Sequence, residues 1–146
     1  MPPGRFAVLT SPSVQGEPQM IDHLSFGVAH VGRSRTFYDS TLGALGYKRL
    51  YSDDNAIGYG TTEPELWLQH AARPVVADPD SGLHLSFKAA SPVEVDAFYR
   101  AALEHGGKDN GGPGKREHYG PGYYAAFVVD PDGYRLEAHC ELDNVV

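Results

Sequence analysis

Apolar and polar residues alternate strictly in two short stretches of the chain. In residues 21–28 the apolar side chains of Leu24, Phe26 and Val28 are separated by polar or small ones, and residues 83–89 repeat this pattern. A period of two with apolar residues on one side is typical of a strand that buries one of its faces. Both stretches are therefore predicted strands, each with one face toward a core.

These two predicted strands contain the same four residues. His-Leu-Ser-Phe occurs at positions 23–26 and again at 84–87, and the same spacing relates further residues downstream. The matched positions are Ala29 with Ala90, Phe37-Tyr38 with Phe98-Tyr99, Leu42 with Leu103, and Gly46 with Gly107. Matches that share one register indicate a duplicated unit, with a histidine at the same place in each copy.

Each copy continues with a helix and then with further strands. Helical spacing of apolar residues covers 31–45 in the first copy, and a second helix is predicted to begin after Ser91 and to stop at Gly106. The strands predicted next are 47–51, 56–60 and 65–70 in the first copy, and a short strand within 108–122, then 123–129 and 134–142 in the second. The order in each half is β-α-β-β-β.

This order predicts an α+β fold of two tandem modules whose sheets join into one curved, cup-shaped mixed sheet. Residues 20–146 form a single domain on this interpretation, with the first module at 20–70, a linker at 71–81 and the second module at 82–146. The turn-rich residues 1–19 are expected to be a flexible arm, or alternatively a short strand that pairs with a sheet edge or a partner subunit.

The composition limits the classes of partner. The chain has 146 residues and a net charge of −7, and its basic residues are dispersed, which argues against nucleic acid or an anionic membrane as the main partner. No stretch approaches the ~18 continuous apolar residues of a membrane span. The single cysteine, Cys140, excludes an internal disulfide and fits a reducing compartment, so the cytoplasm is the expected location.

Three potential metal ligands share the faces that the predicted helices leave uncovered. His23 and His84 lie opposite the apolar faces of their strands, and Glu137 lies opposite Leu136 and Ala138. If the two sheets join into one curved surface, these three side chains point into a single cup. Two imidazoles and one carboxylate on rigid strands form a ligand set for a divalent metal with positions left open for substrate.

Each ligand also has a simpler interpretation. An isolated strand histidine is more often a half-buried polar residue than a metal ligand, and Glu137 is also explained as a solvated residue or as an ion-pair partner of Arg135. The shared repeat position of His23 and His84 favours the metal site.

Aromatic residues are candidates for lining the cup. Tyr123 and Tyr124 point to opposite faces of their strand, so one of them must face the site, where a tyrosine can orient substrate or exchange a proton. We expect Tyr124 to act in catalysis with Glu137 and Tyr123 to contact the substrate; ordinary aromatic packing is the alternative for both. Trp67 faces either the core or the cup, where it would bind substrate.

A glycine-rich segment precedes several cations. Arg116 and His118 follow Gly111-Gly112-Pro113-Gly114, and this loop either receives an anionic substrate at the rim of the cup or is a solvated loop with no ligand. Ser25 and Ser86 lie on the faces of the two histidines and are expected to orient the metal ligands.

The sequence resembles the vicinal oxygen chelate superfamily, which includes glyoxalase I, extradiol dioxygenases, fosfomycin-resistance thiol transferases and bleomycin-resistance proteins. The resemblance rests on the paired modules, the strand-opening histidines, the Phe-Tyr pair in each first helix, the Asp-Pro-Asp-Gly turn at 130–133 and Arg-Leu-Glu-Ala-His at 135–139. It implies metal ligands at His23, His84 and Glu137. Glyoxalase I enzymes usually have a fourth protein ligand, a glutamate on the last strand of the first module. Here the repeat is expected to make Leu68 the residue equivalent to Glu137, so this fourth ligand is missing.

The resemblance implies a metal-dependent enzyme whose small substrate chelates the metal through two neighbouring oxygens. Glyoxalase-like lyase or isomerase, dioxygenase and thiol transferase chemistries all stay open, and the divalent metal is Fe, Mn, Zn or Ni. A non-catalytic binding or drug-sequestering protein of the bleomycin-resistance type is the main alternative, and a paralogue whose cup binds nothing is a third. A homodimer is expected.

Overall fold

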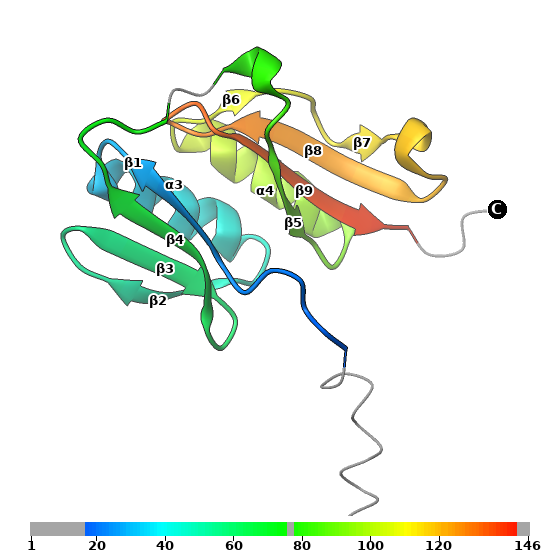
Figure 1. Ribbon diagram of the computed structural model, residues 1–146. Coiled ribbons are helices and arrows are strands. Elements are labelled where there is room, and N and C mark those ends of the chain that lie inside the picture. The colour runs from blue at the N-terminus through cyan, green and yellow to red at the C-terminus, as the bar shows by residue number, and fades with distance from the viewer. Residues whose placement is uncertain (1–16, 76–77, 143–146) are drawn as a thin grey trace, which may run out of the picture.

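The chain folds into two modules that each contain one helix and several strands (Figure 1). The computed structural model describes residues 17–75 and 78–142, so most of the predicted N-terminal arm lies outside the described residues. The first module contains β1 (Leu24–Val28), α3 (Val31–Gly43), β2 (Lys48–Ser52), β3 (Ala56–Gly60) and β4 (Pro64–His70). The second contains the 3-10 turn η1 (Pro79–Ser81), β5 (Leu85–Lys88), α4 (Pro92–Glu104), β6 (Lys108–Asp109), β7 (Gly114–Lys115), the 3-10 turn η2 (Glu117–Tyr119), β8 (Tyr123–Val129) and β9 (Arg135–Glu141).

The two sheets have the same topology. The first has the order β1-β4-β3-β2, with β1 parallel to β4 and the other neighbours antiparallel. The second has the order β5-β9-β8-β6, with β5 parallel to β9, and the short β7 also pairs with β8. The predicted α+β fold of two repeated modules is confirmed.

The strand registers show which positions of the two modules are equivalent. Ser25 pairs with Trp67 on β4, and Ser86, its repeat equivalent, pairs with Glu137 on β9. Trp67 therefore occupies the position in the first module that Glu137 occupies in the second. The predicted equivalence of Leu68 with Glu137 is wrong by one residue, and Leu68 is fully buried in the core. A one-residue change of register moves a side chain to the other face of its strand.

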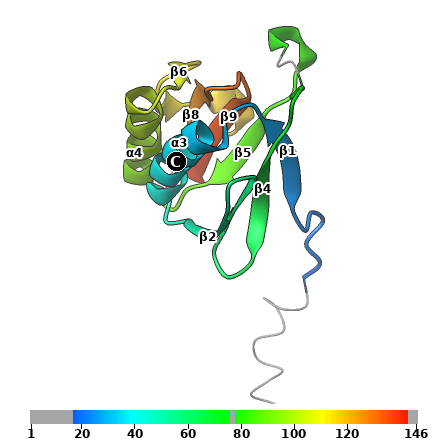
Figure 2. The same cartoon turned by 90° about the vertical axis from the view of Figure 1, so that its left-hand side faces the viewer.

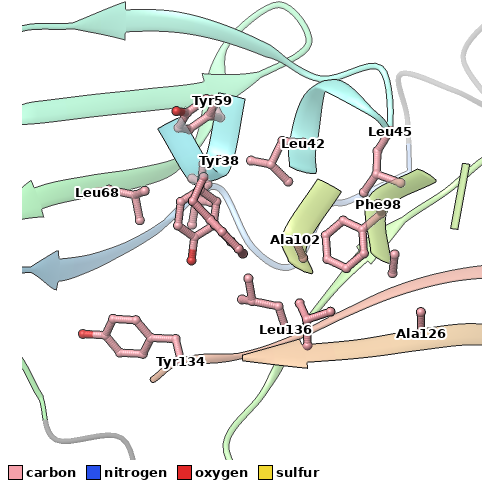
Figure 3. Close-up of a cluster of buried hydrophobic side chains, with 14 of the residues drawn as sticks. Tyr38, Leu42, Leu45, Tyr59, Leu68, Phe98, Ala102, Ala126, Tyr134 and Leu136 are labelled. Carbon is pink, nitrogen blue, oxygen red and sulfur yellow. The ribbon is translucent and has the colours of Figure 1, made fainter. Parts of the chain in front are cut away.

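One hydrophobic core joins the two modules. α3 and α4 lie side by side, and in Figure 2 both are on one side of the molecule while β1 and β4 are on the other. Figure 3 shows side chains from both helices and both sheets meeting between them. The buried set includes Tyr38, Leu42, Tyr59, Leu68, Phe98, Ala102, Ala126 and Leu136.

Polar contacts fix the end of β1 to the turn between β8 and β9. Asp132 in this turn accepts hydrogen bonds from the backbone N–H of Ala29 at 3.0 Å and from Arg33 Nη2 at 3.0 Å. The Tyr134 hydroxyl donates to the carbonyl oxygen of Gly27 at 2.6 Å. The two modules are thus held at one end by bonds between residues more than a hundred positions apart.

The helix boundaries follow their local signals. Ser91 caps α4, because its hydroxyl accepts from the backbone N–H of Glu94 at 3.3 Å, and the Glu94 carboxylate accepts from the N–H of Ala90 at 3.0 Å. α3 ends at Gly43, two residues earlier than predicted. Within the described residues, neither helix is long and apolar enough to span a membrane.

Candidate metal and substrate site

His84 and Glu137 lie together on the second sheet. Glu137 is in the middle of β9 and only 2% of its side chain is exposed, whereas His84 comes directly before β5 and is 44% exposed. The parallel pairing of Ser86 with Glu137 brings the start of β5 alongside the carboxylate. His84 Nε2 and Glu137 Oε1 are 2.9 Å apart. Strand pairing therefore places one nitrogen and one oxygen donor at the same point.

The other oxygen of the carboxylate is bound by a tyrosine. The Tyr123 hydroxyl donates to Glu137 Oε2 at 2.5 Å. Its ring is stacked on His139, with centroids 3.7 Å apart, and Tyr119 packs against it at 5.1 Å. Burial, and then the hydrogen bond to Glu137, raise the pKa of Tyr123, so this hydroxyl stays protonated and donates at neutral pH.

Tyr124 does not face this site. Its side chain lies on the opposite face of β8, where the hydroxyl donates to Asp96 of α4 at 2.7 Å. This hydrogen bond and then burial raise the pKa of Tyr124 to about 12. Tyr124, which we expected to act in catalysis with Glu137, thus bonds to α4, and the neighbouring Tyr123 is the tyrosine that contacts the Glu137 carboxylate.

His23 is separate from the other two predicted ligands. It precedes β1, is 51% exposed, and its Nδ1 lies 2.8 Å from the carboxylate of Asp22. Across residues 17–75 and 78–142 there is no cluster of three or more His, Cys, Asp or Glu side chains that could hold a metal. One chain therefore brings together two of the three predicted ligands.

Arg116 and Phe127 extend the site along β8. Phe127 pairs directly with Glu137, and its ring lies 6.1 Å from that of His84. The Arg116 guanidinium lies 5.4 Å from the Phe127 centroid, and Nη2 donates to the carbonyl oxygen of Gly112 at 2.6 Å. None of the ion pairs between described residues involves Arg116. The site thus carries a guanidinium that no carboxylate of the described chain neutralises.

His118 lies farther out. It belongs to η2, is exposed, and its ring packs on Tyr119 with centroids 4.2 Å apart. Since Tyr119 contacts Tyr123, the ring of His118 is connected to the site through two intervening rings. It borders the site rather than touching the His84–Glu137 pair.

An aromatic shelf covers the equivalent face of the first module. Trp67 lies beside Tyr51 with centroids 5.5 Å apart, and a Cβ atom on Gly58 would come within 2.9 Å of the indole ring. The absence of a side chain at Gly58 is what lets the ring lie close to the sheet. On the same face the Ser25 hydroxyl accepts from Gln69 Nε2 at 3.1 Å. Trp67 thus faces away from the core, one of the two orientations left open by the sequence.

Sequence reasoning missed Tyr51, Phe127 and His139. Phe127 and His139 could have been found from alternation alone, because Phe127 lies four residues after Tyr123 on β8 and His139 lies two residues after Glu137 on β9. Tyr51 could not be found in this way. The register of β2 shifts between Arg49 and Tyr51, so simple alternation no longer predicts which face of the sheet a side chain lies on.

A groove of about 670 Å³ runs between β1 and β5, each of which has one edge that pairs with no other strand of the described residues. Its lining is mainly apolar and includes Leu24, Phe26, Leu66, Leu85 and Phe87. At its mouth Ile21 is 55% exposed and Leu83 is 61% exposed. Open strand edges flanked by exposed apolar residues are a typical surface for association with another chain.

His84 and Glu137 supply two donors of the kinds that bind divalent metals. Nitrogen and oxygen donors converge from two hydrogen-bonded strands, and imidazole with carboxylate is a common set for Fe, Mn, Zn or Ni. A buried carboxylate needs a compensating partner. Among the described residues only His84 and Tyr123 bond to the Glu137 side chain, and neither is a permanent cation.

Comparison with solved structures gives the same fold over most of the chain. A glyoxalase/bleomycin resistance protein from Albidiferax ferrireducens T118 is 29% identical, with a TM-score of 0.72, over 83% of this chain and 98% of that one. A glyoxalase-related enzyme from Fulvimarina pelagi is 19% identical, with a TM-score of 0.65, over 84% of this chain and 88% of that one.

A third similar structure is the fosfomycin resistance protein FosX from Listeria monocytogenes. It is 13% identical, with a TM-score of 0.63, over 87% of this chain and 97% of that one, which shows a shared fold. None of the curated proteins compared with this chain matches it. The family profile described as glyoxalase/bleomycin resistance protein/dioxygenase superfamily matches residues 20–138. With the repeated modules and their common strand order, this match shows that the chain belongs to that superfamily.

Proposed function

We propose that this protein is a metal-dependent enzyme acting on a small substrate that chelates the metal through two neighbouring oxygens. The observation that carries the proposal is the pair formed by His84 Nε2 and the buried Glu137 Oε1, which are 2.9 Å apart, with His84 directly before β5 and Glu137 on the neighbouring β9. The pairing of β5 with β9 holds the two donors next to each other, which suits a site that must leave positions open for substrate.

The third ligand in this proposal is His23 of the partner subunit in a homodimer. The contacts of Asp132 and Tyr134 with the end of β1 hold the two modules of one chain in a fixed arrangement that leaves His23 apart from Glu137. The edges of β1 and β5 that no described strand covers, with the exposed apolar residues beside them, are the surfaces proposed to meet in the dimer.

A bound divalent metal supplies Lewis acidity toward oxygen atoms that acquire negative charge during the reaction. His84 and Glu137 supply its donors on this chain. Arg116, which has no carboxylate partner among the described residues, is proposed to bind an anionic group of the substrate. Trp67 and the ring of Tyr123 are proposed to contact the rest of the substrate, and His118 to border its entrance.

The reaction class stays within lyase or isomerase, dioxygenase and thiol transferase chemistry. Trp67 stands at the position equivalent to Glu137, so the first module offers no carboxylate there and a three-ligand site is favoured. Three protein donors of this kind suit Fe or Mn as well as Zn or Ni. The cytoplasm is proposed as the location because a chain with one cysteine, Cys140, has no internal disulfide that needs oxidising surroundings.

The metal content of protein prepared without added metal tests this function. We expect one divalent ion per chain, with the ion lost in His84→Ala and retained in His70→Ala, which changes an exposed histidine at the end of β4. Folded His84→Ala with undiminished metal would contradict the proposed ligand set. A panel of α-hydroxythioethers, catechols and epoxides with the loaded protein would then define the reaction.

Hybrid dimers test whether the site is shared between subunits. His23→Ala and His84→Ala are each expected to lose metal, but a hybrid of the two has one intact site, formed by His23 of one chain with His84 and Glu137 of the other. Co-refolding equal amounts should therefore restore about a quarter of the sites if subunits pair at random. No restoration would show that each site uses ligands from a single chain.

A sequestering protein of the bleomycin-resistance type is the second candidate. The aromatic shelf of Tyr51 and Trp67 and the groove between β1 and β5 favour it, because both offer apolar surface that does not depend on a metal. Wild-type protein that contains no metal, yet binds an apolar compound with quenching of Trp67 fluorescence, would support this candidate over the enzyme.

A further inference from the structure

The two oxygens of the Glu137 carboxylate have different partners. Oε1 faces His84 Nε2 at 2.9 Å, whereas Oε2 accepts the hydrogen bond of the Tyr123 hydroxyl at 2.5 Å. The carboxylate is 2% exposed, so its orientation depends on these neighbours and not on solvent. The side of the carboxylate that belongs to the proposed metal site is the Oε1 side.

Tyr123 is itself held in place. Its ring is stacked on His139 with an interplanar angle of 21°, and Tyr119 packs against it. Its backbone is in β8, paired with Glu141 of β9. Because His139 on β9 and Tyr119 in η2 pack against this ring, the Tyr123 hydroxyl has little freedom to move away from Oε2.

A carboxylate can bind a divalent cation through one oxygen or through both. In an octahedral site, three single-atom protein donors leave three positions, and a glutamate that binds through both oxygens leaves only two. A substrate that chelates through two oxygens would then occupy every remaining position. The number of Glu137 oxygens bound therefore decides whether a further position stays open beside the chelated substrate.

We infer that Tyr123 is a positioning residue that restricts Glu137 to binding the metal through Oε1 alone. This inference rests on the proposed metal site. By holding Oε2, the hydroxyl keeps a position open that a two-oxygen glutamate would fill. Tyr123 thus acts through Glu137, in addition to any contact that its ring makes with substrate.

Tyr123→Phe isolates the hydroxyl, because the ring that stacks on His139 is retained. Tyr119→Phe is the matched control: Tyr119 is 59% exposed, belongs to the same aromatic cluster and makes no hydrogen bond to Glu137 through its hydroxyl. Both variants and the wild type are loaded with Mn²⁺ and compared by water proton relaxation, which counts exchangeable waters on the metal, and by titration with acetohydroxamate, a chelator that binds through two oxygens.

We expect Tyr123→Phe to lose one exchangeable water and to keep none once acetohydroxamate is bound, whereas the wild type keeps one, because Glu137 bound through both oxygens takes the position that stays open in the wild type. Tyr119→Phe should match the wild type. If Tyr123→Phe has the same number of exchangeable waters as the wild type, both without and with acetohydroxamate, the inference is overturned while the metal site stays intact. Wild-type protein that binds no Mn²⁺ or other divalent metal would overturn both the inference and the proposed function.

A crystal structure of the metal-loaded wild type gives a second test that does not depend on the variant folding. Glu137 bound through Oε1 alone, with Oε2 on the Tyr123 hydroxyl, is the expected result. Both oxygens on the metal, or Tyr123 turned away from Glu137, would overturn the inference.

Discussion

The hydroxyl of Tyr38 in α3 donates a 2.6 Å hydrogen bond to the carboxylate of Asp130, which precedes the turn between β8 and β9. Tyr38 is fully buried and Asp130 is 3% exposed. The other oxygen of Asp130 accepts from the backbone N–H groups of Asp132 and Tyr134 at 2.9 and 2.8 Å. One carboxylate therefore shapes the turn in the second module and binds the helix of the first.

Tyr38→Phe should destabilise the fold. It leaves the ring in the core but removes a donor from a buried carboxylate, which costs about 1–3 kcal/mol. Denaturant unfolding of the variant and wild type at neutral pH measures this loss. Tyr59→Phe is the matched control, since its hydroxyl bonds to Asp39 at the module surface, and it should cost less. Equal losses of unfolding free energy in the two variants would show that the Tyr38–Asp130 bond between the modules contributes no more than the bond of Tyr59.

Stability should fall as pH rises from about 4 to about 6. Burial raises the pKa of Asp130 to about 6 from an unfolded value of 3.8. Between these values the folded state holds a proton that the unfolded state has released, so raising the pH favours unfolding, by up to about 3 kcal/mol in all. Chemical denaturation should show that the wild type loses stability relative to Asp130→Asn as pH rises across this range. Parallel curves would contradict it.

Gly107→Ala should destabilise the contact between the modules. A Cβ atom there would lie 2.7 Å from Phe37 Cε2 and 2.8 Å from the carbonyl oxygen of Ala102. Because a backbone carbonyl cannot move without distorting the helix, we expect the free energy of unfolding to fall by about 1–3 kcal/mol. Gly32→Ala in α3 meets nothing within 4 Å and should stabilise by about 0.5–1 kcal/mol. Thermal melts of both variants should therefore move in opposite directions.

Gly58→Ala should displace the indole of Trp67. The new methyl would lie 2.9 Å from Cζ3 and 3.1 Å from Cη2 of that ring, so the ring must move away from the sheet. Because the chain has one tryptophan, its fluorescence reports this change directly. We expect altered emission with the overall fold retained by circular dichroism. An emission spectrum identical to that of wild type would show that the shelf does not depend on this glycine.

Leu83→Asp should weaken the proposed dimer and its metal binding together. Leu83 is 61% exposed at the mouth of the groove, where a carboxylate would oppose burial against a second chain. Sedimentation velocity and metal analysis are the measurements. Val93→Asp, at a 73% exposed position on α4, is the control and should change neither. If Leu83→Asp is a monomer that retains all its metal, the metal site does not depend on the dimer interface.

Much of the scaffold followed from the sequence alone. The duplicated His-Leu-Ser-Phe segment and the alternation around it predicted two β-α-β-β-β modules, because a period of two sets which side chains share a face. The same alternation placed His84 and Glu137 on one face of one sheet, and strand pairing brings their side chains together. Local signals also predicted the start of α4 at Ser91 and Pro92.

Tertiary structure decided what alternation leaves open. A period of two separates Tyr123 from Tyr124 but does not say which of them faces Glu137, since that depends on which side of the sheet α4 covers. Pairing register, set by neighbouring strands, made Trp67 the equivalent of Glu137 in place of Leu68. The separation of His23 from Glu137 is fixed by contacts between residues far apart in the sequence, which no local pattern encodes.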